Sequence, residues 1–490
     1  MSAQRARCYR FVATLVALGF VGSTTSAFAA TYYVDAAAAS DSGNGSSSSP
    51  KKYISSALAL MSSSGGDAVI IRPGTYSNAK DAITSVPSGK QGSYNVIKAE
   101  TDGTVTIKAA FELGRGDHYT QFEGLKWDSA QQKSIVGRYV KVMRCAFKGG
   151  PSSGNAMTLS IGTNDATPGA QYILLEDVWA YGPGGRYKVI VYNSDSVVLR
   201  RVVVRHDAGW TYDNNNPQGG ITSYNSSNVR LQDVIVIDGT RGMAGMEGNI
   251  YLVGNDSSAT MPTNVRIQGA IVLNGGGNGI SYDDFKAYTN SSIQDAVVWK
   301  VDGAGITIGG AAHKATVNRV AVSSGSSAFA DYSSGGNGMT ITNAIAYQNP
   351  SAVLKNLSNA SYIVGYGNGD STGTQLNPLT NGFKYLPRIE NGSTLKTMGS
   401  GGGQIGPQIT QRIGVSGTLF GEAGFEDETA QPLWPWPNEA RIKTDFAEYN
   451  SRGFSASAGS LTDYIWDFLG SSSPVSPAIT PNAPTSVQVQ

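Results

Sequence analysis

The chain has 490 residues, of which 40% are hydrophobic and only 15% are charged. This composition excludes a disordered chain, which is poor in apolar residues, and a long coiled coil, which needs far more charge. Lys and Arg number 37 against 36 Asp and Glu, so the chain lacks the basic surplus expected of a nucleic-acid-binding protein.

Residues 1–29 have the pattern of a secretory signal peptide. Three arginines within the first ten residues precede an apolar run, Phe11 to Val21, that is too short to span a bilayer. A stretch of small residues then ends in an A-x-A cleavage sequence at Ala29. We therefore expect a bacterial protein that is cleaved near Ala29, is secreted or periplasmic, and has no membrane span.

Residues 50–65 read as an amphipathic helix. Ile54 (or Tyr53), Ala57, Leu58 and Met61 would share one apolar face. A repetitive fold needs its open end covered, and a short helix does this. The segment predicts an N-terminal cap.

A six-residue motif recurs between residues 122 and 346. It reads apolar, polar, Asp/Asn/Gly/Arg, small apolar, any residue, apolar, and successive copies start 20 to 36 residues apart. The period-two alternation and the Val and Ile content indicate strands, each preceded by a second short alternating strand. The nine copies are FEGLKW, VMRCAF, LEDVWA, LRRVVV, LQDVIV, IQGAIV, IQDAVV, VNRVAV and ITNAIA.

No helical segment interrupts these units, so crossover helices of an α/β fold are absent from the pattern. Propeller repeats are longer, and β-sandwiches do not normally show so regular a motif. The pattern predicts an all-β fold, a right-handed parallel β-helix (a solenoid), whose stacked coils share one apolar core. Asn-rich corners such as residues 225–228 suit the left-handed backbone that a coil corner needs.

The end of the chain differs from the middle. We expect the β-helix domain with its cap at residues 30–377 and an irregular tail at 378–470 that packs on the solenoid or caps its far end. Residues 461–470 read as a short helix. Residues 471–490 are rich in Pro and Ser and are expected to be disordered.

The start of the expected mature chain carries a resemblance. The pieces SDSGNG at 40–45, GDAV at 66–69 and RPGTY at 72–76 resemble the opening of secreted right-handed parallel β-helix proteins of the pectate-lyase-like superfamily. The resemblance implies action on an extracellular or cell-surface polysaccharide by a lyase, hydrolase or epimerase, or a non-catalytic role. The catalytic sequences expected of those enzymes are not found, so it implies a substrate class and no catalytic residues.

Two insertions, residues 207–219 and 239–249, lengthen neighbouring units, and a shorter loop at 183–187 sits in the equivalent place. In a solenoid such excess residues leave as loops, often on the binding face. Strand alternation places Tyr192, Tyr224 and Tyr251 on the outer face of the sheet beside these loops. Their rings would stack on sugars, or would simply stabilise the sheet.

The ionisable residues near these loops supply the candidate chemistry. Arg186 and His206 complete the predicted substrate-binding set, with His206 alternatively a histidine that packs the loop. For β-elimination on a uronate, Arg241 with Glu247, or Lys188 with Tyr224, would neutralise the carboxylate and remove the α-proton.

Three further interpretations of this region stay open. Glu247 and Asp283 on successive coils would serve a hydrolase. Asp213, Glu247 and Asp283 would be the ligands if Ca²⁺ is bound, and no other cofactor is expected. The leading hypothesis is a polysaccharide lyase, and the alternatives are a hydrolase, an epimerase or a non-catalytic polysaccharide-binding protein.

Overall fold

The computed structural model describes residues 28–152, 154–163, 169–207, 217–240, 247–254, 263–283, 290–310, 314–333 and 338–475. Most of the expected signal peptide and of the expected disordered end lie outside the described residues. No helix in the described ranges is long and apolar enough to cross a membrane.

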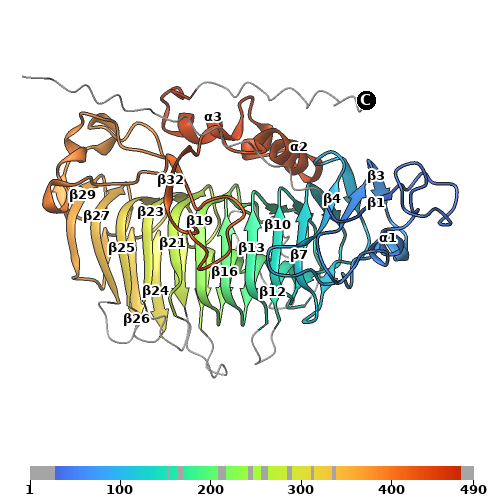
Figure 1. Ribbon diagram of the computed structural model, residues 1–490. Coiled ribbons are helices and arrows are strands. Elements are labelled where there is room, and N and C mark those ends of the chain that lie inside the picture. The colour runs from blue at the N-terminus through green and yellow to red at the C-terminus, as the bar shows by residue number, and fades with distance from the viewer. Residues whose placement is uncertain are drawn as a thin grey trace, which may run out of the picture.

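The chain winds into a long solenoid whose faces are two large parallel sheets (Figure 1). One is a 20-stranded sheet made of β1 (Thr31–Val34), β2 (Ala68–Ile71), β3 (Gly74–Tyr76), β4 (Asn95–Ala99), β5 (Val105–Ile107), β7 (His118–Glu123), β8 (Leu125–Asp128), β10 (Arg138–Met143), β11 (Ala146–Lys148), β13 (Gln171–Glu176), β14 (Trp179–Tyr181), β16 (Asp195–Arg200), β17 (Val203–Val204), β19 (Ser227–Ile237), β21 (Arg266–Leu273), β23 (Ser291–Val301), β25 (Ala315–Ser324), β27 (Met339–Tyr347), β29 (Ala360–Tyr366) and β30 (Thr374–Gln375).

The other is a 10-stranded sheet that closes each coil. It is made of β6 (Glu112–Leu113), β9 (Lys133–Ile135), β12 (Met157–Gly162), β15 (Tyr187–Tyr192), β18 (Gly219–Tyr224), β20 (Gly248–Val253), β22 (Ile280–Asp283), β24 (Ile306–Gly310), β26 (Phe329–Ser333) and β28 (Leu354–Lys355). From β6 onward, the coils alternate between one strand of this sheet and either two short strands or one long bent strand of the 20-stranded sheet. The predicted parallel β-helix is confirmed.

The six-residue motif marks the corner at which each coil bends within the 20-stranded sheet. The first residues of all nine copies pair in register along the stack: Phe122, Val142, Leu175, Leu199, Leu231, Ile267, Ile293, Val317 and Ile341. The third residue of every copy has φ between 50° and 73°. Only this left-handed backbone turns the strand, which explains the Gly, Asn and Asp found there.

Where the third residue is Arg201 or Arg319, its side chain forms an ion pair with the Asp at the same position of the preceding coil. Arg201 pairs with Asp177 at 2.6 Å, and Arg319 pairs with Asp295. The strain of a left-handed arginine is thus accompanied by a charge-assisted hydrogen bond to the previous corner.

The solenoid interior is one continuous apolar core from Val34 to Ile363. In the 10-stranded sheet, Val189, Ile221, Ile250, Ile280 and Ile306 point into this core and are fully buried. The predicted alternation of the strands is therefore confirmed.

The N-terminal helix is shorter than predicted. Helix α1 spans Ile54–Leu58 only, although Ile54, Ala57, Leu58 and Met61 are all buried as expected. The Ser and Gly residues that follow favour turns, and the Asp67 carboxylate accepts the Ser62 N–H at 2.6 Å, which fixes the chain in a non-helical path.

The tail packs along the outer face of the solenoid (top of Figure 1). It contains the antiparallel hairpin β31 (Gln411–Ile413) and β32 (Glu428–Pro432), helix α2 (Glu439–Tyr449), which the sequence analysis did not predict, and helix α3 (Leu461–Trp466), which it did. Tail residues including Trp434, Phe446 and Trp466 form a second apolar cluster with outward residues of the 20-stranded sheet such as Trp179 and Trp299.

The corner residues of the motif also hold the tail. Asp233 accepts the Ile413 N–H at 2.8 Å, and Asp295 accepts the Gln408 N–H at 2.9 Å. The outer face of the 10-stranded sheet contributes no residue to the apolar cluster under the described tail.

Candidate functional site

The predicted tyrosines lie together on the outer face of the 10-stranded sheet. Tyr192 pairs in register with Tyr224, and their ring centroids are 4.8 Å apart. Tyr251 belongs to the same small outer cluster as Tyr187, Ile190, Val253 and Met157. Alternation along β15, β18 and β20 therefore gathers an aromatic surface that is separate from the solenoid core.

The middle of this face is closed, and its described residues become partly accessible toward the ends of the strands. Tyr251, which strand alternation places on the outer face, is buried, and so are its neighbours on the middle of this face: Ile190, Thr222, Ser281 and Thr307. The Thr222 hydroxyl, the ring of Tyr187 and the Cβ of Tyr251 crowd the space over Gly219, so a side chain that points away from the core does not necessarily reach solvent. Tyr192, Tyr224 and Asp283, at the carboxyl ends of their strands, are half-buried and form the accessible part.

A pair of acidic residues and an arginine accompany Tyr251. The Tyr251 phenol donates a hydrogen bond to Asp283 Oδ2 at 3.1 Å. Burial and the charge of Asp283 raise the pKa of Glu247, and Arg186 acts in the opposite direction. Burial, Asp283 and Glu247 raise the pKa of Tyr251, so its phenol stays protonated and acts as a donor.

Arg186 stands at the start of β15, and its guanidinium lies 5.7 Å from the ring centroid of Tyr187. Its Nη1 donates to Asn155 Oδ1 at 3.4 Å, and its backbone carbonyl accepts the Gln218 N–H at 2.9 Å. The side chain is half-buried, so a cation is available beside the acidic pair.

Lys188, predicted as a catalytic residue, does not line this site. Its side chain is fully buried, and its amine donates to the carbonyls of Gly182 and Gly184 at 2.6 and 2.5 Å. Burial lowers the pKa of Lys188 to about 7. The Gly-rich loop before β15 folds back over the Lys188 amine. A sequence pattern does not predict this fold of the loop.

His206, predicted to bind substrate or to pack the loop, has the packing role. It is fully buried, and its Nε2 lies 3.1 Å from the carbonyl oxygen of Arg186. Burial and the nearby charge of Lys188 lower the pKa of His206 to about 3, so the ring is neutral near pH 7. It supports the backbone of Arg186 from beneath and does not contact the surface.

Arg241 and Asp213 lie outside the described residues. Both insertions connect the 20-stranded sheet to the 10-stranded sheet, directly before β18 and β20. Most residues of both insertions lie outside the described residues.

The described residues do not supply the predicted calcium ligands as a set. Glu247 and Asp283 provide two carboxylates, but no group of three or more His, Cys, Asp or Glu side chains converges within the described ranges. Calcium usually takes six or more oxygen ligands.

Tyr187 and Gln218 belong to the site but were missed by sequence reasoning. The Tyr187 phenol donates to Gln218 Oε1, and the ring joins the outer cluster. By strand alternation Tyr187 would share the inward direction of Val189 and Val191. The chain reaches β15 through Gly184 and Gly185, both at positive φ, and the regular alternation begins only after Tyr187.

No family model and no curated protein matches the chain. Among solved structures it is similar to pectate lyase Pel9A, with 17% identity over 77% of this chain and 96% of that chain and a TM-score of 0.43. XylC in complex with xylose is 6% identical over 71% and 86%, with a TM-score of 0.45. An alginate lyase from Paenibacillus sp. str. FPU-7 is 11% identical over 63% and 95%, with a TM-score of 0.35.

At these identities the similarities assign no activity to this chain. The parallel β-helix that the resemblance implies is present in the strand pairing of this chain.

Proposed function

We propose that the protein is an exported carbohydrate-active enzyme that cleaves a uronate-containing extracellular polysaccharide on the outer face of the 10-stranded sheet. The observation that carries this proposal is the cluster of Glu247, Asp283, Tyr251 and Arg186 beside the open tyrosines. Aromatic rings stack on the apolar faces of sugars, and the ionisable cluster lies where such a sugar would rest.

β-Elimination is the first candidate reaction. The base takes the proton α to the uronate carboxylate, a carbon–carbon double bond forms as the neighbouring carbon–oxygen bond breaks, and the departing sugar oxygen takes up a proton from solvent. Arg186 would neutralise the carboxylate, and a Glu247 carboxylate of raised pKa is a stronger base than an exposed one. The protonated phenol of Tyr251 would hold Asp283 in place.

Hydrolysis is the second candidate, favoured by the presence of two interacting carboxyl groups. Glu247, whose pKa is raised, would donate a proton to the leaving oxygen. Asp283 would act as the second carboxylate, oriented by the Tyr251 phenol.

A panel of polyuronates and neutral glycans tests the proposal through its products. Ultraviolet-absorbing unsaturated ends on a uronate polymer support β-elimination, and new reducing ends without absorbance support hydrolysis. If the protein is retained on a glycan column but forms neither product from any glycan tried, the enzyme proposal is contradicted and a polysaccharide-binding role is supported.

A further inference from the structure

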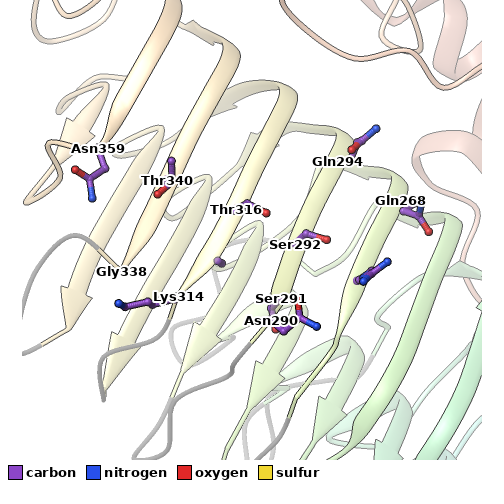
Figure 2. Close-up of a pocket in the computed structure, with 12 residues that line it drawn as sticks. Gln268, Asn290, Ser291, Ser292, Gln294, Lys314, Thr316, Gly338, Thr340 and Asn359 are labelled. Carbon is purple, nitrogen blue, oxygen red and sulfur yellow. The ribbon is translucent and has the colours of Figure 1, made fainter. Parts of the chain in front are cut away.

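A second groove lies on a different face of the solenoid, on the outer surface of the 20-stranded sheet. Figure 2 shows this groove, which crosses β21, β23, β25 and β27 and has a volume of about 630 Å³. Pockets that hold small ligands fall in this size range. The groove lies on a different sheet from the site described above.

Polar side chains line the groove in rows that follow the stack. Arg266, Ser292, Thr316 and Thr340 are paired in register on successive strands, and Gln268 pairs with Gln294 in a parallel row. Strands in a sheet lie about 4.8 Å apart, so the rows offer hydroxyl and amide groups at a regular interval. A periodic row of this kind suits a linear polymer lying along the solenoid axis.

The groove carries positive charge. Arg266 and Lys314 line it, and the lining residues include no Asp or Glu among those that the structure describes. Arg266 shares Glu426 with Arg230, but Glu426 lies 3.7 Å from Arg266 and 2.6 Å from Arg230. The guanidinium of Arg266 therefore keeps donors for another anion.

Lys314 is exposed and makes no ion pair or hydrogen bond with any described residue. The side-chain amide oxygen of Gln268, Oε1, is buried and has no hydrogen-bond partner among the described residues. Thr316 and Thr340 are exposed between these groups. Arg266, Lys314 and the two threonines thus line the same groove, and Figure 2 shows Lys314, Thr316 and Thr340 on neighbouring strands.

We propose that this groove is a second binding site, distinct from the cleavage site, for an acidic polysaccharide. The two cations would pair with its carboxylates, and the amide and hydroxyl rows would bond its hydroxyls. Nucleic acid is disfavoured because no aromatic residue is among the described residues that line the groove, so bases have no ring on which to stack. Binding here does not depend on cleavage at the 10-stranded sheet.

Lysine footprinting on the full chain tests the site directly. Amines are acetylated with and without hexagalacturonate or hexamannuronate, and the acetylation of Lys314 is measured by peptide mass spectrometry. Lys108 is the internal control, because it is exposed and makes no ion pair with a described residue. With ligand at ten times its Kd, acetylation of Lys314 should slow about tenfold while that of Lys108 is unchanged.

Two variants complete the test. Arg266→Ala should weaken the protection of Lys314 so that about tenfold more hexamer is required, whereas Lys108→Gln should leave it unchanged. Equal protection by a neutral hexasaccharide, absence of protection by both acidic hexamers, or stronger protection by single-stranded DNA would overturn the proposal. Footprinting measures binding and not product formation. A negative footprint therefore contradicts the groove proposal alone, and a negative cleavage assay contradicts the proposed enzyme activity alone.

Discussion

Replacing Asp233 by Asn should change how the stability of the protein depends on pH. Burial raises the pKa of Asp233 to about 7, although its carboxylate accepts the Ile413 N–H at 2.8 Å. Asn keeps an acceptor oxygen and tolerates the left-handed backbone at this position, where φ is 51°. The substitution therefore removes the ionisation and preserves both the turn and the contact with the tail.

The sign follows from the raised pKa. Below the ordinary pKa of 3.8 the carboxyl is protonated in both states. Between 3.8 and about 7 the unfolded chain ionises while the folded one does not, so stability falls as pH rises. The loss between pH 4 and pH 8 is about 4 kcal/mol, at about 1.4 kcal/mol per pKa unit.

The unfolding entropy of a chain of roughly 450 ordered residues is about 1 kcal/mol per kelvin. The wild type should therefore lose about 4 °C of melting temperature, relative to Asp233→Asn, between pH 4 and pH 8. Other titrating groups cancel in this difference, because both proteins share them. A difference that stays flat over this range, or that changes in the opposite direction, would refute the reasoning.

Three further predictions concern the tail, the corners and the site. Trp179→Ala should cost about 3–5 kcal/mol and speed proteolysis of the tail, because the ring is fully buried and its Nε1 donates to Asp445 at 2.7 Å. At Arg144, where φ is 54°, a Val variant should be less stable than a Gly variant by about 1–2 kcal/mol in thermal unfolding; equal stability would contradict the left-handed corner. Tyr251→Phe, which removes the donor to Asp283, should lower the rate of cleavage about tenfold or more with an unchanged circular dichroism spectrum; an unchanged rate would remove Tyr251 from the site.

The coil geometry could be predicted because it depends on local rules. Alternation sets which residues face the core, and the need for a left-handed residue favours Gly, Asn or Asp at the third position of the motif, where three copies carry Arg instead. Asp233 and Asn343, for example, both occupy that position and both have positive φ. The same rules apply in every coil, so the register followed from the repeat alone.

The fifth residue of the motif, for which the sequence analysis allows any residue type, also indicates where the tail packs. Eight of the nine copies have an apolar residue there, such as Trp179 or Ile235, and these residues form the surface on which the tail packs. The exception, Lys126, is 2.9 Å from Asp445 and 2.6 Å from Glu448 of the tail. An outward apolar column in a solenoid indicates a covering segment.

The candidate site was predicted only in part. Alternation brought Tyr192, Tyr224 and Tyr251 to one face, but it says nothing about loops that fold back over a strand. Lys188 and His206 are buried because the chain around Gly182 and Arg186 covers them, and this depends on tertiary contacts that a sequence pattern does not contain.

The rate of product formation by Glu247→Gln tests the central claim most directly. Glu112→Gln is the matched control, because Glu112 is exposed on β6 of the same sheet, in an earlier coil. On the polysaccharide that the wild type cleaves, we predict that Glu247→Gln loses about 100-fold or more of the rate and that Glu112→Gln retains it. A Glu247→Gln protein as active as the Glu112→Gln control would contradict a cleavage site on the 10-stranded sheet.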